Sequence, residues 1–236
     1  MFKHHGASRT FYHNFKLAIL LSFVSGIVNV SGLFAFGVLT TNVTGHFAFF
    51  SEKLIFIDYK KASIFLLFTL CFLLGAFLSN FISTFAAKKN SKNPHLYPIL
   101  LEIILITSVV LSMNTENLSI IDSQVYTFSL LIAMGIQNAL VTFISKSVVR
   151  TTHLTGLFTD LEIDISQYIF NQDIQKNKSL IQNMQLKFSI IFTFALGCIL
   201  GGYLFQFFKI KTLLLASIFL LLIVVYDNFK NKNLIS

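Results

Sequence analysis

Long apolar segments separated by short polar gaps make up most of the chain. Six of them approach the roughly 20 residues that a helix needs to cross about 30 Å of hydrocarbon, and they cover residues 15–39, 62–87, 97–113, 125–149, 184–208 and 211–228. The third is short and contains Glu102. Two further segments, 44–57 and 155–170, are too short or too polar to be ordinary spans. This pattern predicts an all-α polytopic membrane protein with about six transmembrane helices and two short half-helices.

One motif occurs twice in the polar gaps. Residues 40–47 read TTNVTGHF and residues 151–158 read TTHLTGLF, which are identical at five of eight positions. Each copy follows an apolar segment that contains Gly-Ile-x-Asn, beginning at Gly26 in the first and at Gly135 in the second. Such internal duplication in an apolar chain is typical of secondary transporters.

A third match, between the segments that begin at Leu74 and Leu200, extends the duplication further along the chain. We therefore predict one membrane domain over residues 1–236, built of two repeat units at about 15–113 and 125–228. The shift between matched positions grows along the chain, so the second unit contains extra residues. The polar stretch 171–183 fits this insertion and is predicted to be a cytoplasmic loop.

The distribution of basic residues selects between two topologies. If the two short segments do not cross, 13 of the 18 Lys and Arg residues lie in the cytoplasm, whereas a topology with eight spans leaves 11 there. The positive-inside rule favours six spans with both termini in the cytoplasm. Three crossings per unit is an odd number, so the second unit must be inverted relative to the first.

The composition agrees with a membrane location. The chain is 55% hydrophobic and 12% charged, with too few charges to cover the surface of a soluble protein. Its net charge of +8 arises mostly in the gaps between apolar segments, where basic residues set orientation, so nucleic acid is not expected as a partner. Cys71 and Cys198 lie inside apolar segments without a CxxC motif and are expected to be free buried thiols.

The repeated motif predicts two re-entrant elements. Seven extended residues reach some 20 Å, enough to dip from a membrane face to its midplane, and a helix of about 13 residues returns by the same distance. We expect Thr44 and Thr155 to be the N-caps of these half-helices, with Gly45 and Gly156 permitting close backbone approach. Irregular backbone at this depth requires protein or a water-filled cavity around it.

Two helix N-termini near the midplane would favour an anion or a polar solute. Hydroxyl, amide, glycine and guanidinium groups around them form the candidate substrate site, which comprises Asn29, Thr40, Thr41, Thr44, Gly45, Gln137, Asn138, Arg150, Thr151, Thr152, Thr155 and Gly156. The alternative is structural: the threonines cap helices, and the three amides join helices by hydrogen bonds. Arg150 has no counterpart in the first copy and either contacts a substrate charge or anchors a helix end at the cytoplasmic face.

Acidic residues follow the second motif. Asp160 and Asp164 share one helix face, where they are either partners of the helix dipole or, for Asp160, a carrier of a coupling proton. His46 and His153 do not repeat a ligand pattern, so neither a metal nor another cofactor is expected.

The string Arg-Thr-Thr-x-x-Thr-Gly-x-x-Thr-Asp at residues 150–160, preceded by Gly-Ile-Gln-Asn-Ala at 135–139, resembles the YoaK-like family of bacterial inner-membrane proteins, a domain family of unknown function. The resemblance covers nearly the whole chain. It implies a multi-pass protein of the bacterial cytoplasmic membrane and supplies no substrate.

Taken with the repeat, these observations favour a small secondary transporter or permease over two alternatives, a membrane-embedded enzyme and a non-transporting scaffold. The enzyme hypothesis rests only on Asp160 and Asp164, because the sequence contains no Gly-x-Ser-x-Gly, His-Glu-x-x-His or Gly-rich phosphate loop. The expected partners are the lipid bilayer and a small solute, and assembly into a homo-oligomer is left open.

Overall fold

The computed structural model describes residues 10–91, 93–113, 119–171 and 173–232, with the side chains described up to residue 227. The described residues are helical throughout, with no strand among them. The helices are α1 (Phe11–Phe36), α2 (Val43–Ile55), α3 (Tyr59–Lys88), α4 (Leu96–Ser112), α5 (Ile120–Ser145), α6 (Leu154–Phe170), α7 (Ile174–Phe208) and α8 (Leu213–Lys232), with the 3-10 turn η2 (Lys209–Thr212) between the last two.

Four segments of the described chain are long and apolar enough to cross a membrane: α1, α3, α5 and the continuous stretch Ile174–Asp227, which contains both α7 and α8. Helix α4 is apolar but has only 17 residues. The prediction of a helical protein with membrane-spanning segments is therefore confirmed at this level.

Helices α1 and α5 form the centre of the molecule. In the most apolar window of each, 72% of α1 and 61% of α5 is buried, whereas the corresponding share of α3 is 28%. The outer face of α3 presents large apolar side chains, among them Leu73, Phe77 and Phe81, each more than half exposed. A face of this kind is suited to hydrocarbon rather than to water.

Each half of the chain packs its third helix on the first helix of the other half. Helix α7 lies along α1, and α3 lies along α5. Glycines allow both approaches: a Cβ added at Gly26 or Gly135 would overlap a backbone carbonyl oxygen, that of Phe194 or of Phe72 respectively. Small residues at such crossings let two helix backbones come close together.

The same contacts correct the sequence alignment of the two copies. Gly197 faces Phe23 across the α1–α7 crossing, as Gly75 faces Ile132 across the α3–α5 crossing. The counterpart of Gly75 is therefore Gly197, and the match with the segment at Leu200 is wrong by one helical turn. The error arises because Leu-Gly occurs twice in succession in α7, at 196–197 and 200–201.

The prediction of a loop at 171–183 is also wrong, since α7 begins at Ile174. With 35 residues and a rise of about 1.5 Å each, α7 is some 52 Å long, well beyond the thickness of a hydrocarbon core. Its polar first ten residues are a helical extension of the apolar part. The polar composition of residues 171–183 suggests a loop, but Gln, Lys and Leu, which occur in this stretch, are good helix formers.

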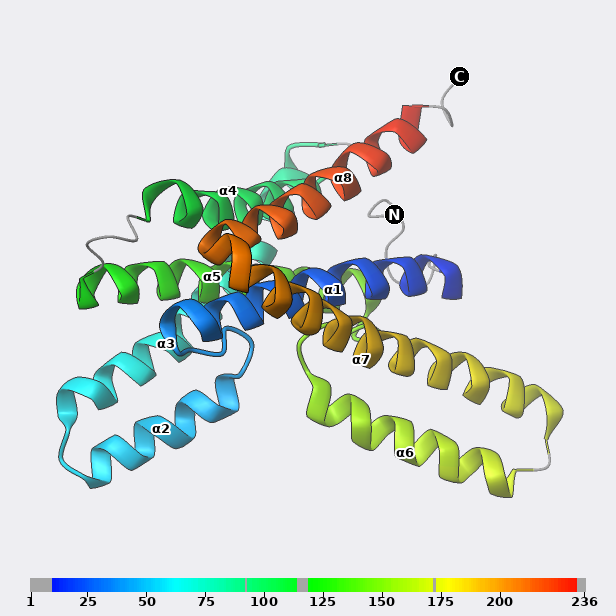
Figure 1. Cartoon of the computed structure of the whole chain (residues 1–236). Coiled ribbons are helices and arrows are strands. Elements are labelled where there is room, and N and C mark those ends of the chain that lie inside the picture. Colours follow the sequence, from blue (N-terminus) through cyan, green and yellow to red (C-terminus); the bar gives the residue numbers. More distant parts are fainter. Residues whose placement is uncertain (1–9, 92, 114–118, 172, 233–236) are drawn as a thin grey trace.

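Figure 1 shows α2 paired with α3 on one side of the molecule and α6 paired with α7 on the other. The N-terminal ends of α2 and α6 point toward each other near the middle, and their C-terminal ends lie at the two outer tips. At 13 and 17 residues, both are shorter than an ordinary span. This arrangement brings the two copies of the repeated motif together.

Candidate functional site

After α1 ends at Phe36, the chain turns back along the helix that it has just left. The backbone N–H and the hydroxyl of Thr41 both donate to Oδ1 of Asn29, at 3.1 and 3.0 Å. Asn29 lies seven residues before the end of α1, so the connecting segment returns by about 10 Å along the helix axis. The amide of Asn29 thus fixes the depth at which α2 begins.

The second copy repeats this arrangement. The hydroxyl of Thr152 donates to Oδ1 of Asn138 at 2.8 Å, and Asn138 also lies seven residues before the end of its helix, α5. Both asparagines therefore accept from the second threonine of the motif that follows them. An amide in an apolar helix is costly to bury without such a partner, which explains the Gly-Ile-x-Asn and Thr-Thr elements together.

The half-helices begin earlier than the sequence analysis predicted. Helix α2 starts at Val43 with Asn42 as N-cap, and α6 starts at Leu154 with His153 as N-cap. The assignment of Thr44 and Thr155 as N-caps is therefore wrong by two positions in each copy. In α2 the reason is that Asn42 caps better than Thr and accepts from the N–H of Gly45 at 3.0 Å.

The motif glycines make room for these cap residues. A Cβ added at Gly45 would lie 2.5 Å from Nδ2 of Asn42, and one added at Gly156 would lie 2.7 Å from Cε1 of His153. Each cap side chain thus folds over the first turn of its own helix. The group that lies closest to each motif glycine is thus the side chain of its own cap residue.

A cavity of about 370 Å³ lies between the two motif copies. Each half of the chain contributes an asparagine of its first helix, four residues at the start of its half-helix and one phenylalanine of its outer helix. The full lining is Asn29, Thr41, Asn42, Val43, Thr44, Phe72, Asn138, Thr152, His153, Leu154, Thr155 and Phe194. These twelve residues are six pairs of repeat positions: each residue from the first half of the chain has its counterpart from the second half in the same wall.

The pairing includes Phe72 and Phe194, which correspond when Gly75 is matched with Gly197. Neither phenylalanine belongs to the repeated motif, and the sequence analysis missed both. The corrected alignment of α3 with α7 is the signal that would have found them. Asn42, Val43 and Leu154 were also absent from the predicted site, and His153 was considered there only as a metal ligand.

The N-terminal ends of two helices form part of the cavity wall. The first turns of α2 and α6 begin there, and their leading N–H groups have no partner inside the helix. Helix α6 has no side-chain cap hydrogen bond. Nη1 of Arg150 lies 3.4 Å from Nδ1 of His153, and since a guanidinium can only donate, Nδ1 is the acceptor in this contact. Among the described residues, no acidic side chain lines the cavity.

Three predicted site residues lie behind the cavity rather than on its wall. Gln137 is fully buried and donates from Nε2 to the carbonyl oxygen of Leu21 at 2.9 Å, which ties α5 to α1. Thr151 accepts from the same amide at 3.4 Å and is fully buried, as is Thr40. The contacts of Gln137 and Thr151 join α5 to α1 and to the returning chain, as in the structural alternative, whereas the hydroxyl of Thr40 has no hydrogen-bond partner within the described residues.

The acidic residues after the second motif also lie off the cavity wall. The side chain of Asp160 is exposed, and its backbone carbonyl oxygen accepts a hydrogen bond from Nζ of Lys187 at 3.0 Å. Asp164 forms an ion pair with Lys187 at 2.6 Å that joins α6 to α7. Within the described ranges no group of three or more His, Cys, Asp or Glu residues is arranged to hold a metal ion.

Comparison with known proteins gives a family and no activity. No curated protein and no solved structure matches the chain. A family match covers residues 17–226, which includes most of α1, all of α5 and both motif copies. It is consistent with the YoaK-like resemblance of residues 135–160. The chain therefore belongs to the family described as protein of unknown function, DUF1275.

Proposed function

We propose that this protein is a small secondary transporter whose solute binds in the cavity between the two motif copies. In this proposal the two halves form an inverted repeat with three crossings each, α2 and α6 are re-entrant half-helices, and one half moves against the other around the cavity. The protein acts on a small polar or anionic solute and not as an enzyme.

The observation that carries the proposal is the composition of the cavity wall, which consists of six pairs of repeat positions. A packing defect would be lined by unrelated residues. A site at the interface of two repeats, built from half-helix N-termini and the unwound backbone before them, is the arrangement that secondary transporters use.

The choice of solute rests on the groups that the wall offers. The first turns of α2 and α6, with the hydroxyl-bearing Thr44 and Thr155, belong to the cavity wall, and none of its described lining residues is a carboxylate. Positive dipole ends and N–H donors stabilise an anion. The oxygens of Asn29 and Asn138 are already engaged by Thr41 and Thr152, so they contribute little further to a cation.

Accessibility of the cavity from the two sides of the membrane tests transport directly. Single cysteines at Thr44 and Thr155, in a background with Cys71→Ala and Cys198→Ala, are treated with an impermeant thiol reagent added to one side or the other of sealed vesicles. Alternating access predicts that each cysteine is labelled from both sides. A scaffold or a fixed cavity gives labelling from one side only, and that result would contradict the proposal.

Binding of small anions tests the solute class. Nitrate, acetate and sulfate are used as probes, and stabilisation of the purified protein against heating reports binding. Arg150 is exposed and outside the cavity wall, so Arg150→Gln should weaken anion binding by about fivefold or less. Lys88→Gln, at an exposed helix end remote in sequence from the motif, is the control. Equal effects of both variants would leave Arg150 as a topology signal.

A further inference from the structure

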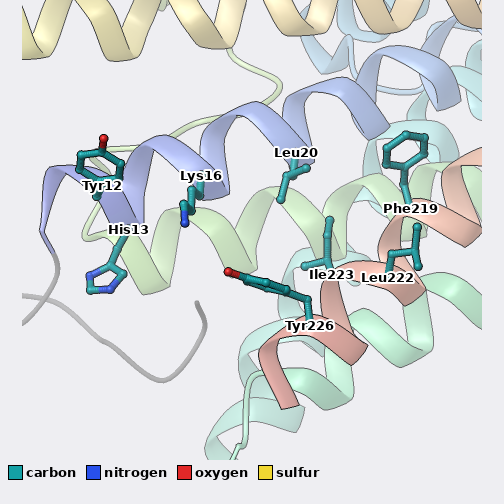
Figure 2. Close-up of a pocket in the computed structure, with 8 residues that line it drawn as sticks. All are labelled: Tyr12, His13, Lys16, Leu20, Phe219, Leu222, Ile223 and Tyr226. Atoms are coloured by element: carbon teal, nitrogen blue, oxygen red, sulfur yellow. The ribbon is translucent and has the colours of Figure 1, made fainter. Parts of the chain in front are cut away.

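A second cavity, of about 380 Å³, lies between the start of α1 and the second half of α8, away from the two motif copies. Figure 2 shows Lys16 and His13 projecting from α1 and the hydroxyl of Tyr226 pointing back toward them from α8. Leu20, Phe219 and Ile223 line the other part of the groove. Its size is within the range of cavities that bind small molecules.

The groove is polar at one end and apolar at the other along both of its walls. On α1, residues 12, 16 and 20 follow one face at four-residue spacing, and they change from Tyr to Lys to Leu. On α8, the change runs from Phe219 through Ile223 to Tyr226. Because α1 leaves the terminal end of the molecule and α8 returns to it (Figure 1), the polar end is the same for both helices.

This polar end lies where a membrane–water interface is expected. Both helices belong to segments that could span a membrane, and the groove begins in the first turns of one and approaches the end of the other. Tyr12 and Tyr226 are 71% and 54% exposed, and amphipathic aromatic rings of this kind are enriched at the headgroup level of membrane proteins. The apolar part of the groove then extends toward the hydrocarbon.

The described lining of the groove includes one basic side chain, that of Lys16, and no carboxylate. Lys16 is exposed and has no ion-pair partner in the described part of the chain. The terminal sequences 1–20 and 219–236 contain five Lys and Arg residues, and Asp227 is their one acidic residue. Asp227 is only 1% exposed, has its own partner and is not among the residues that line the groove.

We propose that this groove binds an anionic glycerophospholipid, with its phosphate at Lys16 and the hydroxyl of Tyr226 and one acyl chain along Leu20, Phe219 and Ile223. A lysine supplies a point charge for a phosphate, and a tyrosine hydroxyl can donate to a phosphate oxygen. Basic pockets between helices at the interfacial level are the usual sites for such headgroups. A zwitterionic lipid lacks the net charge that this end of the groove selects.

The test uses the full chain purified in a mild nonionic detergent, with native mass spectrometry as readout. Phosphatidylglycerol and phosphatidylcholine of identical acyl chains are offered separately at equal concentration. We expect one phosphatidylglycerol to be retained preferentially, and Lys16→Gln to lower its retention about fivefold, the effect of roughly one lysine–headgroup interaction. Leu20→Trp, which fills the apolar part of the groove, should lower retention while leaving Lys16 in place.

Lys88→Gln is the matched control, because Lys88 is an exposed lysine at the end of a spanning helix and is predicted to lie at the same membrane face. Equal retention of the two lipids by the unmodified protein would overturn the proposal. So would equal losses in Lys16→Gln and Lys88→Gln, since these would indicate general attraction to a basic surface. Lipid retention in detergent does not depend on transport, so it can fail or succeed independently of the proposed function.

Discussion

Asn42 and Gly45 act as a unit at the start of α2. The amide oxygen of Asn42 accepts from the N–H of Gly45, and the missing Cβ of Gly45 leaves space for that amide. Losing an N-cap costs about 1 kcal/mol of stability. We therefore expect Asn42→Ala to lower the free energy of unfolding by about 1 kcal/mol in the native background and by much less when Gly45→Ala has already displaced the cap.

The coupling between the two residues is measured by a double-mutant cycle. Thermal unfolding in detergent is compared for the unmodified protein, Asn42→Ala, Gly45→Ala and the protein with both changes. The corresponding pair in α6 is the comparison, since His153 makes no side-chain cap hydrogen bond. His153→Ala should therefore cost less than Asn42→Ala. Additive costs for Asn42→Ala and Gly45→Ala would refute the assigned role of the glycine.

Glu102 is a buried carboxyl group in α4. It is completely inaccessible, and neither of its carboxyl oxygens has a hydrogen-bond partner within the described residues. Burying a polar group without a partner costs about 1–3 kcal/mol, so Glu102→Met, which keeps the volume and removes the polar oxygens, should raise the free energy of unfolding by about 1–3 kcal/mol. Thermal unfolding in detergent measures this, with Glu52→Met at a half-exposed position as the control. A less stable Glu102→Met protein would mean that the carboxyl has a partner after all.

Among the helices, the α1–α7 crossing depends on the absence of a side chain at Gly197. A Cβ there would overlap the carbonyl oxygen of Phe23, whereas a Cβ at Gly202 in the same helix would meet its nearest neighbour at 3.4 Å, an ordinary contact. We expect Gly197→Ala to destabilise the protein by about 1–3 kcal/mol through overpacking. Gly202→Ala, with the same change in helix propensity, should be close to neutral. Equal unfolding temperatures of the two variants would contradict the close crossing.

The ion pair between Asp164 and Lys187 holds α6 against α7. It is 2.6 Å long, with side-chain exposures of 11% for Asp164 and 19% for Lys187. Removing the lysine leaves a nearly buried carboxylate without its partner, at a cost of about 2 kcal/mol. Lys187→Met should lower the unfolding temperature accordingly, and the added change Asp164→Asn should restore part of the loss. Lys178→Met, in the polar extension of α7, controls for the loss of a lysine.

Helix existence could be predicted from the sequence because it depends on apolar length, and the six long segments and two short ones all correspond to helices. The limits of α7 could not, because a polar helix that extends beyond the bilayer has no apolar period to reveal it. The prediction of the N-cap residues was wrong for another reason. Thr44 and Asn42 are both good cap residues, and the choice depends on the bond from Thr41 to Asn29, which fixes where the returning chain stops.

The part of the candidate cavity that is lined by the repeated motif could be predicted from the sequence. Thr41, Thr44, Thr152 and Thr155 line it as expected. Phe72 and Phe194 could not be predicted, because nothing in the local sequence distinguishes them from the many other aromatic residues of α3 and α7. Their positions follow only from the crossings at Gly75 and Gly197, which are contacts between the two halves of the chain.

At the scale of the whole molecule, the exchange of outer helices links the two halves. Helix α3 packs on α5, and α7 packs on α1, so neither half encloses its own first helix. Both half-helices begin at the interface so formed, with the cavity between their first turns. Relative movement of the halves would change the cavity and both glycine crossings together, which is why the crossings and the site belong to one proposal.

Membrane topology decides whether the two halves are inverted, and the loops before and after α3 give the decisive pair of positions. With six spans, Lys60 lies on the outer side and Lys89 in the cytoplasm, whereas eight spans would reverse both, because α2 would then cross the bilayer before α3. Helix α2 has only 13 residues, about 20 Å of helix against roughly 30 Å of hydrocarbon, which favours six spans.

To test this topology, Lys60→Cys and Lys89→Cys, each in a background with Cys71→Ala and Cys198→Ala, are labelled in intact cells with an impermeant thiol reagent. We expect Lys60→Cys to react and Lys89→Cys to react only after the membrane is permeabilised. The opposite pattern would make α2 a full span, and the half-helix site, which requires the first turn of α2 to lie within the bilayer, would no longer stand.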